Sequence, residues 1–144
     1  PAQNVMNALA ERIERGGGAA LIFDYGDWRS LGDTLQALHA HEKVSPLFKP
    51  GQCDLTAHVD FEALALAAAE GGCAYSRLTP QGIFLERLGI TQRAQALSTA
   101  HGGSSQAEVS AAHRRLTHPA EMGNLFKVLG LYPEAAAPPP GLNA

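Results

Sequence analysis

The sequence predicts an α/β fold, in which helices alternate with buried strands along the chain. The first observation behind this prediction is the apolar run at 18–23, which has about the length of a strand. It lacks the alternation of a half-exposed strand, so we expect other layers to cover both of its faces. The second observation is its abrupt polar ending, Asp24-Tyr25-Gly26. In open α/β sheets, ligands bind at this carboxyl edge.

Composition and length are those of one ordinary soluble domain. The 144 residues are 45% hydrophobic and carry a formal net charge of −3, which argues against a nucleic-acid-binding surface. No apolar run approaches the roughly 20 residues that span a bilayer, and we expect no signal peptide before the first helix. Cys53 and Cys73 are too few and too isolated for a disulfide framework or a zinc site. We therefore expect a cytoplasmic or organelle-matrix protein with no nucleic-acid partner and no membrane insertion.

The start of the chain has the pattern of the second half of a βαβ unit. Residues 1–15 carry an apolar stripe at Val5, Leu9 and Ile13, which has the period of a helix, and three glycines end that helix. A strand at 19–24 follows at once. The strand that should precede the helix is missing, and the chain starts without a methionine. We therefore expect the chain to be a piece of a longer protein.

A loop-rich section precedes the second helix. The polar stretch at 27–33 should be a loop, 34–38 a short strand, and 42–53 a long irregular loop because it contains two prolines and a glycine. Residues 54–59 then alternate polar and apolar side chains, which is the period of a strand. Asp60 suits the N-cap of the helix that follows.

The second half of the chain is mainly helical in pattern. A strand at 73–78 and a helix over 79–89 complete the α/β part. Ser105 and Glu108 have the spacing of a capping box for a later helix, and 122–129 should form a last short one. The predicted segments are an α/β part at 1–89, a helical extension at 90–131 and a disordered tail, rich in Ala and Pro, at 132–144.

Five sequence motifs resemble a known family of enzymes. They are LIFDYG at 21–26, GDTLQA at 32–37, DLTAHVDF at 54–61, TPQG at 79–82 with LGI at 88–90, and MGNLFKVL at 122–129. In order and spacing, they resemble the carboxyl half of the MidA-type S-adenosyl-L-methionine-dependent methyltransferases. These are bacterial relatives of the mitochondrial protein arginine methyltransferase that assists the assembly of respiratory complex I. The resemblance covers roughly residues 1–131.

This resemblance implies the C-terminal half of a class I (Rossmann-like) methyltransferase fold, with an antiparallel strand near the end of a mostly parallel sheet and added C-terminal helices. It also implies S-adenosyl-L-methionine (SAM) as methyl donor. For the mitochondrial relative, it implies an arginine of a complex I subunit as methyl acceptor.

The same resemblance places the binding of SAM outside this chain. In the family, the glycine-rich loop and the acidic residue that bind SAM lie upstream of the motifs found here. The glycines at 16–18 and 71–72 precede strands, so neither run can be that loop. We therefore assign no SAM-binding residue here. We expect the missing N-terminal half of the protein to bind the donor, and the chain alone to be inactive.

The candidate site residues come from the motifs at the ends of predicted strands. We assign catalytic roles to Asp24, whose carboxylate can orient a guanidinium, and to His58, as a base or hydrogen-bond donor. The candidate substrate-binding residues are Tyr25, Gly26, Thr34, Gln36, Thr56 and Asp60. Structural roles compete with these assignments: Asp24 can begin a turn, Asp60 can cap its helix, and His58 can hydrogen-bond within its strand.

Two other functions compete with the methyltransferase assignment. His39 and His41 face the same way in an extended segment, and His58 or Asp54 can complete a metal site of a hydrolase or a metal-binding module. No HExxH helix or cysteine pair supports that rival. Alternatively, the chain is a non-catalytic interaction module whose helical part, at 90–129, binds a partner or a second copy of the chain.

Overall fold

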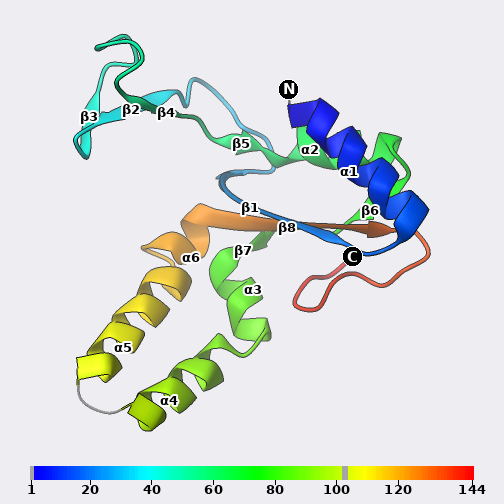
Figure 1. Cartoon of the computed structure of the whole chain (residues 1–144). Helices are drawn as coiled ribbons and strands as arrows, with labels where there is room; N and C mark the ends of the chain where they lie inside the picture. The colour runs from blue at the N-terminus through cyan, green and yellow to red at the C-terminus, as the bar shows by residue number, and fades with distance from the viewer. Residues whose placement is uncertain (1, 102–103) are drawn as a thin grey trace.

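The computed structural model describes residues 2–101 and 104–144. The helices are α1 (Ala2–Gly16), α2 (Phe61–Glu70), α3 (Gln81–Arg87), α4 (Ile90–His101), α5 (Ser104–Thr117) and α6 (Met122–Leu125). The strands are β1 (Ala20–Asp27), β2 (Gln36–His39), β3 (Glu42–Val44), β4 (Asp54–Thr56), β5 (Val59–Asp60), β6 (Cys73–Tyr75), β7 (Thr79–Pro80) and β8 (Phe126–Pro133). In Figure 1, α1 and α2 lie on one face of the main sheet. A small sheet of β2, β3 and β4 extends away on one side, and the hairpin of α4 and α5 on another.

The main sheet confirms the predicted α/β fold. Its strand order is β5-β1-β8-β6, and β7 also pairs with β8. Strand β8 is antiparallel to β1, with Ala20 opposite Leu131 and Tyr25 opposite Phe126. Strand β6 is antiparallel to β8 and therefore runs parallel to β1. A parallel pair with an antiparallel strand inserted near the end of the sheet is what the methyltransferase resemblance implied.

One face of the main sheet carries the larger hydrophobic core. Helix α1 contributes Met6, Ala10 and Ile13, which recur at helical spacing and are at most 5% exposed. Phe61, the first residue of α2, is fully buried in the same cluster together with apolar side chains of β8. The buried stripe of α1 differs from the predicted one, because Val5 points to solvent with 60% of its surface exposed.

The opposite face of β1 is covered only in part, contrary to the prediction. Leu21 and Phe23 are 44% and 42% exposed. The ring of Phe23 meets Phe84 of α3 edge-on, with 5.4 Å between centroids. Phe84, Val128 and Leu142 form a smaller core cluster on this side. The continuous apolar run of β1 is therefore not matched by two complete covering layers within the described residues.

Residues 126–129 form a strand rather than the end of the last helix. The apolar run Phe126–Pro133 enters the sheet as β8, between β1 and β6, and Val128 and Leu129 are 0% exposed. A short apolar run fits a buried strand as well as a helix, and strands pair with this one on both of its edges. Within the helical extension predicted for 90–131, residues 126–131 are therefore strand and not helix. The division of the chain into three segments stays a prediction.

The C-terminal tail packs on the smaller core, although its composition predicted disorder. No helix or strand is found among residues 134–144, yet Leu142 is only 7% exposed. Arg87 Nη1 donates a hydrogen bond to the Gly141 carbonyl at 3.1 Å. The backbone N–H of Arg77 donates to the Asn143 carbonyl at 2.9 Å. One apolar anchor and these hydrogen bonds hold the tail in place.

The small sheet arises partly where an irregular loop was predicted. Strand β2 pairs with β3 on one edge and β4 on the other, both antiparallel. A two-residue turn joins β2 to β3, and its residues Ala40 and His41 have φ angles of 50° and 66°. Residues other than glycine and asparagine rarely adopt this left-handed conformation, and tight hairpins favour Asn-Gly. The sequence therefore carried no recognisable signal for the hairpin.

Candidate functional site

An open cavity lies at the carboxyl end of β1, where the sequence predicted a ligand site. Its volume is about 450 Å³. Strand β1 contributes Gly26 and Asp27 to the lining, and the loop between β4 and β5 contributes His58. The opposite wall comes from α6 and its flanks: Pro119, Ala120, Glu121, Asn124, Leu125 and Lys127. Two of the predicted site residues, Gly26 and His58, therefore meet in one cavity.

The close approach of β1 and β5 explains why glycine occupies position 26. Gly26 pairs with Val59 in parallel register, and its φ angle is 158°. A side chain at this position would collide with the backbone carbonyl oxygen of Val59. The absence of a side chain lets β5 pack close to β1, which places His58 at the rim of the cavity.

The ring of Tyr25 lies between two other aromatic rings at this edge. Its centroid is 5.6 Å from that of His58 and 5.6 Å from that of Phe126, and both contacts are edge-on. The backbone N–H of His58 donates a hydrogen bond to Thr34 Oγ1 at 3.1 Å. Four predicted site residues, Tyr25, Gly26, Thr34 and His58, therefore form one connected group at this edge of the sheet.

The other four predicted residues, like Tyr25 and Thr34, are not among those that line this cavity within the described part of the chain. Asp24 pairs with Lys127 inside β1, so it does not begin a turn, and its Oδ1 accepts the backbone N–H of Tyr25 at 2.8 Å. Asp60 Oδ1 accepts the N–H of the third residue of α2 at 3.0 Å, so Asp60 is the N-cap that was predicted. Gln36 and Thr56 face each other across β2 and β4. Their functional roles stay predictions.

A polar cluster that the sequence did not reveal holds the loop after β1. The Glu62 carboxylate accepts hydrogen bonds from Trp28 Nε1 at 3.0 Å and from Arg29 Nε and Nη2 at 2.6 and 2.8 Å. The hydrogen bond from Arg29 lowers the pKa of Glu62, with a smaller contribution from Trp28, while burial acts in the opposite direction. The same bond raises the pKa of Arg29. A glutamate in the first turn of a helix is common for electrostatic reasons, so no local pattern linked it to Trp28 and Arg29.

The histidine pair of the metal-site alternative has other contacts. His39 Nδ1 lies 3.1 Å from the carbonyl oxygen of Gln52, and its ring meets Phe48 edge-on. His41 lies in the turn between β2 and β3. Among residues 2–101 and 104–144, no group of three His, Cys, Asp or Glu side chains is arranged to hold a metal ion. The geometry gives the hydrolase alternative no support.

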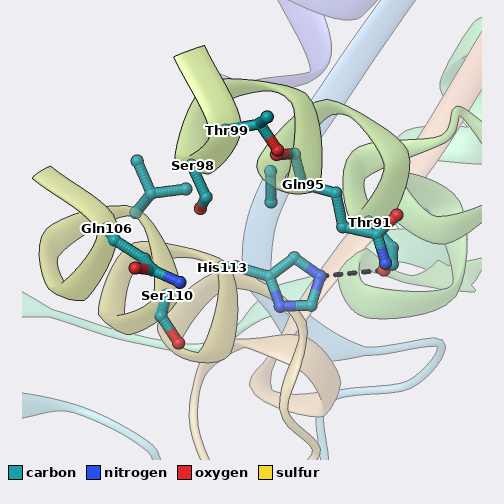
Figure 2. A pocket seen from close by; sticks show the side chains of 9 residues that line it. Thr91, Gln95, Ser98, Thr99, Gln106, Ser110 and His113 are labelled. Carbon is teal, nitrogen blue, oxygen red and sulfur yellow. Dashed lines mark hydrogen bonds between the residues drawn. The ribbon is translucent and has the colours of Figure 1, made fainter. Parts of the chain in front are cut away.

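A separate groove of about 370 Å³ lies between α4 and α5 (Figure 2). Its labelled polar side chains are Thr91, Gln95, Ser98, Thr99, Gln106, Ser110 and His113. His113 Nε2 lies 3.0 Å from Thr91 Oγ1 and 3.3 Å from the Glu86 carboxylate. Through these contacts His113 of α5 connects α3 and α4. The side chain of Ser105, predicted to cap α5, lies outside the described residues.

Comparisons with known proteins identify relatives over most of the chain. The family described as "Putative S-adenosyl-L-methionine-dependent methyltransferase" matches residues 1–79. The chain is 39% identical over 130 residues to the mitochondrial protein arginine methyltransferase NDUFAF7 homolog of Drosophila melanogaster, a match that covers 90% of this chain and 30% of that protein. It is 33% identical over 130 residues to mitochondrial protein arginine methyltransferase NDUFAF7 of Homo sapiens, covering 90% and 29%.

Two solved structures from Burkholderia thailandensis share the fold. One COG1565 superfamily protein superposes with a TM-score of 0.77 at 28% identity, covering 90% of this chain and 36% of that chain. A second COG1565 superfamily member, bound to S-adenosyl-homocysteine, has a TM-score of 0.69 at 31% identity, covering 88% and 35%. The chain thus spans about 30% of the length of the curated relatives it matches.

Proposed function

Because the chain belongs to the family of S-adenosyl-L-methionine-dependent methyltransferases, we propose that it forms the acceptor side of a protein arginine methyltransferase. The observation that carries this proposal is the connected group of Tyr25, Gly26, Thr34 and His58, which we call the acceptor group, beside an open cavity on the carboxyl edge of the sheet. Ligands of open α/β sheets bind at this edge. The relatives named as protein arginine methyltransferases supply the expected acceptor, a guanidinium.

The chemistry of the acceptor group suits a guanidinium. The face of an aromatic ring attracts a cation, which gives Tyr25 a role in binding. A carboxylate holds a guanidinium through charge-assisted hydrogen bonds, a role we assign to Asp24. His58 would accept the proton that the guanidinium nitrogen loses, and Thr34 would hold His58 in place. Gly26 keeps this wall free of a side chain.

Three further residues complete the proposed substrate-binding set. Gln36 and Thr56 lie opposite each other in the small sheet, which extends away from the main sheet. We assign them to contacts with the substrate polypeptide on either side of its arginine. Asp60, besides capping α2, accepts the backbone N–H of Ser30 at 3.4 Å and so supports the loop that lies between β1 and the small sheet.

The donor side of the site lies in the remainder of the protein in this proposal. The glycine runs at 16–18 and 71–72 lead into β1 and β6, so they cannot form a loop from a strand into a helix that would cradle SAM. These glycine runs of the chain therefore do not form a binding loop for SAM, and we assign the residues of this chain no role in holding the donor. The COG1565 member bound to S-adenosyl-homocysteine identifies the ligand class that the remainder would hold.

An incomplete edge of β1 supports docking of that remainder. Residues 20–25 pair with β8 on one edge, whereas on its other edge β1 pairs with β5 at Gly26 and Asp27. Unpaired strand edges favour pairing with another strand. Leu21 and Phe23 lie half-exposed on the same stretch. We therefore propose that the N-terminal half of the protein packs against this edge and this face of β1.

The substrate and compartment follow from the same relatives. We propose a protein substrate and, by the family resemblance, a subunit of respiratory complex I. The cytoplasmic location predicted from composition competes with the mitochondrial one in the relatives' names. Within residues 2–101 and 104–144, no helix is long and apolar enough to cross a membrane. Cell fractionation of the organism that carries this chain decides between the two compartments.

Calorimetry and a methyl-transfer assay test the proposal. SAM should bind the full-length protein, and the 144-residue chain alone should bind it weakly or not at all. With radiolabelled SAM, the full-length protein should methylate an arginine peptide and not its lysine counterpart. Failure of the full-length protein to bind SAM would favour the interaction-module alternative. Tight binding of SAM by the 144 residues would overturn the assignment of the donor side to the remainder.

A further inference from the structure

The loop that leaves the carboxyl end of β1 is fastened to the first turn of α2. Besides accepting the three side-chain hydrogen bonds from Trp28 and Arg29, Glu62 donates its backbone N–H to the Trp28 carbonyl at 2.8 Å. The backbone N–H of Ser30 reaches the Asp60 carboxylate at 3.4 Å. Main-chain and side-chain contacts therefore fix three successive residues of the loop. We call this arrangement the Glu62 clamp.

The geometry of the clamp selects one orientation of the loop. Arg29 presents Nε and Nη2 to the two carboxylate oxygens of Glu62, which is the fork arrangement of a bidentate pair. The Glu62 side chain is 25% exposed, so the arginine and the indole cover much of it. A carboxylate in the first turn of a helix is also favoured by the helix dipole.

Both ends of the clamped loop belong to the cavity. On one side, Trp28 follows Asp27, which lines the cavity with Gly26. On the other side, the loop leads to Thr34, whose hydroxyl accepts the backbone N–H of His58. Movement of the loop would therefore shift the cavity wall and release His58.

We propose that Glu62 is a positioning residue for the acceptor arginine: it fixes the loop at 27–34 and thereby the cavity wall that Asp27 and His58 form. This inference rests on the proposed function, because it assigns the cavity to the acceptor. Glu62 itself does not line the cavity. Its effect reaches the acceptor through Trp28 and Arg29.

Kinetics of the full-length protein test the clamp, with the pentapeptide Gly-Gly-Arg-Gly-Gly as acceptor. Glu62→Gln removes the charge that holds Arg29, and it should raise the KM for the peptide about two- to fivefold. The dissociation constant for SAM should stay unchanged, because the donor binds elsewhere. Arg29→Ala should have the same effect, and Arg29→Lys, which keeps the charge, a smaller one. Glu11→Gln is the matched control. It removes the exposed ion pair of Glu11 with Arg15 on α1 and should leave the KM for the peptide unchanged.

A spectroscopic measurement separates positioning from general stability. In protein labelled with 5-fluorotryptophan, the ¹⁹F resonance that disappears in Trp28→Phe reports on the clamp. Glu62→Gln should shift that resonance, and Glu11→Gln should not. A shifted resonance with an unchanged peptide KM would overturn the proposal, as would an equal loss of affinity for SAM. If the unsubstituted protein transfers no methyl group, the proposed function fails, and titration of the peptide against the ¹⁹F resonance then tests the clamp. Weaker peptide binding in Glu62→Gln would support it, and absence of peptide binding would overturn it.

Discussion

The two faces of the main sheet differ in how far this chain completes them. On the face under α1 and α2, Phe61 and Leu129 are 0% exposed. On the opposite face, Leu21 and Phe23 of β1 remain more than 40% exposed, although α3 and the tail lie on that side. An apolar sheet face must be buried against another layer. The contrast supports our proposal that the remainder of the protein packs on the second face and on the adjoining edge of β1.

The strongest test of this contrast truncates one phenylalanine on each face in the full-length protein. Phe61→Ala should lower the free energy of unfolding by about 3–5 kcal/mol, because a fully buried ring leaves a cavity. If the remainder of the protein covers the second face, Phe23→Ala should cost a comparable amount, despite its 42% exposure in this chain. Denaturant unfolding measures both. A cost below about 1 kcal/mol for Phe23→Ala, typical of a surface position, would show that the second face stays open.

A smaller effect is expected where β5 closes the edge of β1. Gly26→Ala should cost about 3 kcal/mol, the upper end for overpacking, because its side chain would meet the backbone of Val59. It should also weaken binding of the substrate peptide to the acceptor group, because β5 must move away from β1 and His58 would move with it. Gly16→Ala is the control, because a side chain there meets no atom within 4 Å. Equal thermal stability of the two variants would contradict the close approach of the strands.

The elements that the sequence predicted correctly are those with a local signature. The period of α1, the apolar run of β1 and the cap at Asp60 each lie within a few consecutive residues. Strand β8 was mistaken for helix because its identity depends on pairing with β1 and β6, which are distant in sequence. The predicted cover on both faces of β1 failed for the same reason, since periodicity cannot show which layer packs on a strand.

The candidate site likewise contains residues that the sequence predicted and residues that it did not reveal. The motif at 21–26 placed Tyr25 and Gly26 near the carboxyl end of β1. The strand predicted at 54–59 is instead divided into β4 and β5, and His58 reaches the same edge from the loop between them, next to the parallel pairing of β5 with β1. The Glu62 clamp was missed because Trp28 and Glu62 are 34 positions apart and neither carries a motif. Contacts of this kind depend on the tertiary structure and leave no periodic trace.

The tail provides a weaker test of how the second face is closed. Leu142 is 7% exposed beside Phe84 and Val128, so Leu142→Ala should cost about 2 kcal/mol, the low end for a buried leucine. Leu47→Ala is the control, because Leu47 is 85% exposed and its truncation should stay within about 0.5 kcal/mol. Equal thermal stability of the two variants would mean that the tail is disordered, as its composition predicted.

The smallest expected effect is a pH dependence of the stability that the Glu62–Arg29 ion pair contributes at the end of the covered face. The pKa of Glu62 lies below the ordinary glutamate value of 4.5 in the folded protein, because the ionised carboxylate accepts the hydrogen bonds of Arg29. A group with a lowered pKa contributes stability above its unfolded pKa, and this contribution is lost as the pH falls through the folded pKa. The melting temperature of the unsubstituted protein should therefore exceed that of Glu62→Gln at pH 7, and the difference should shrink below about pH 4.5. The pair is largely exposed on the arginine side, so 1 M salt should reduce the difference at pH 7. A difference that stays constant from pH 7 to pH 3 would show that the ion pair does not stabilise the clamp.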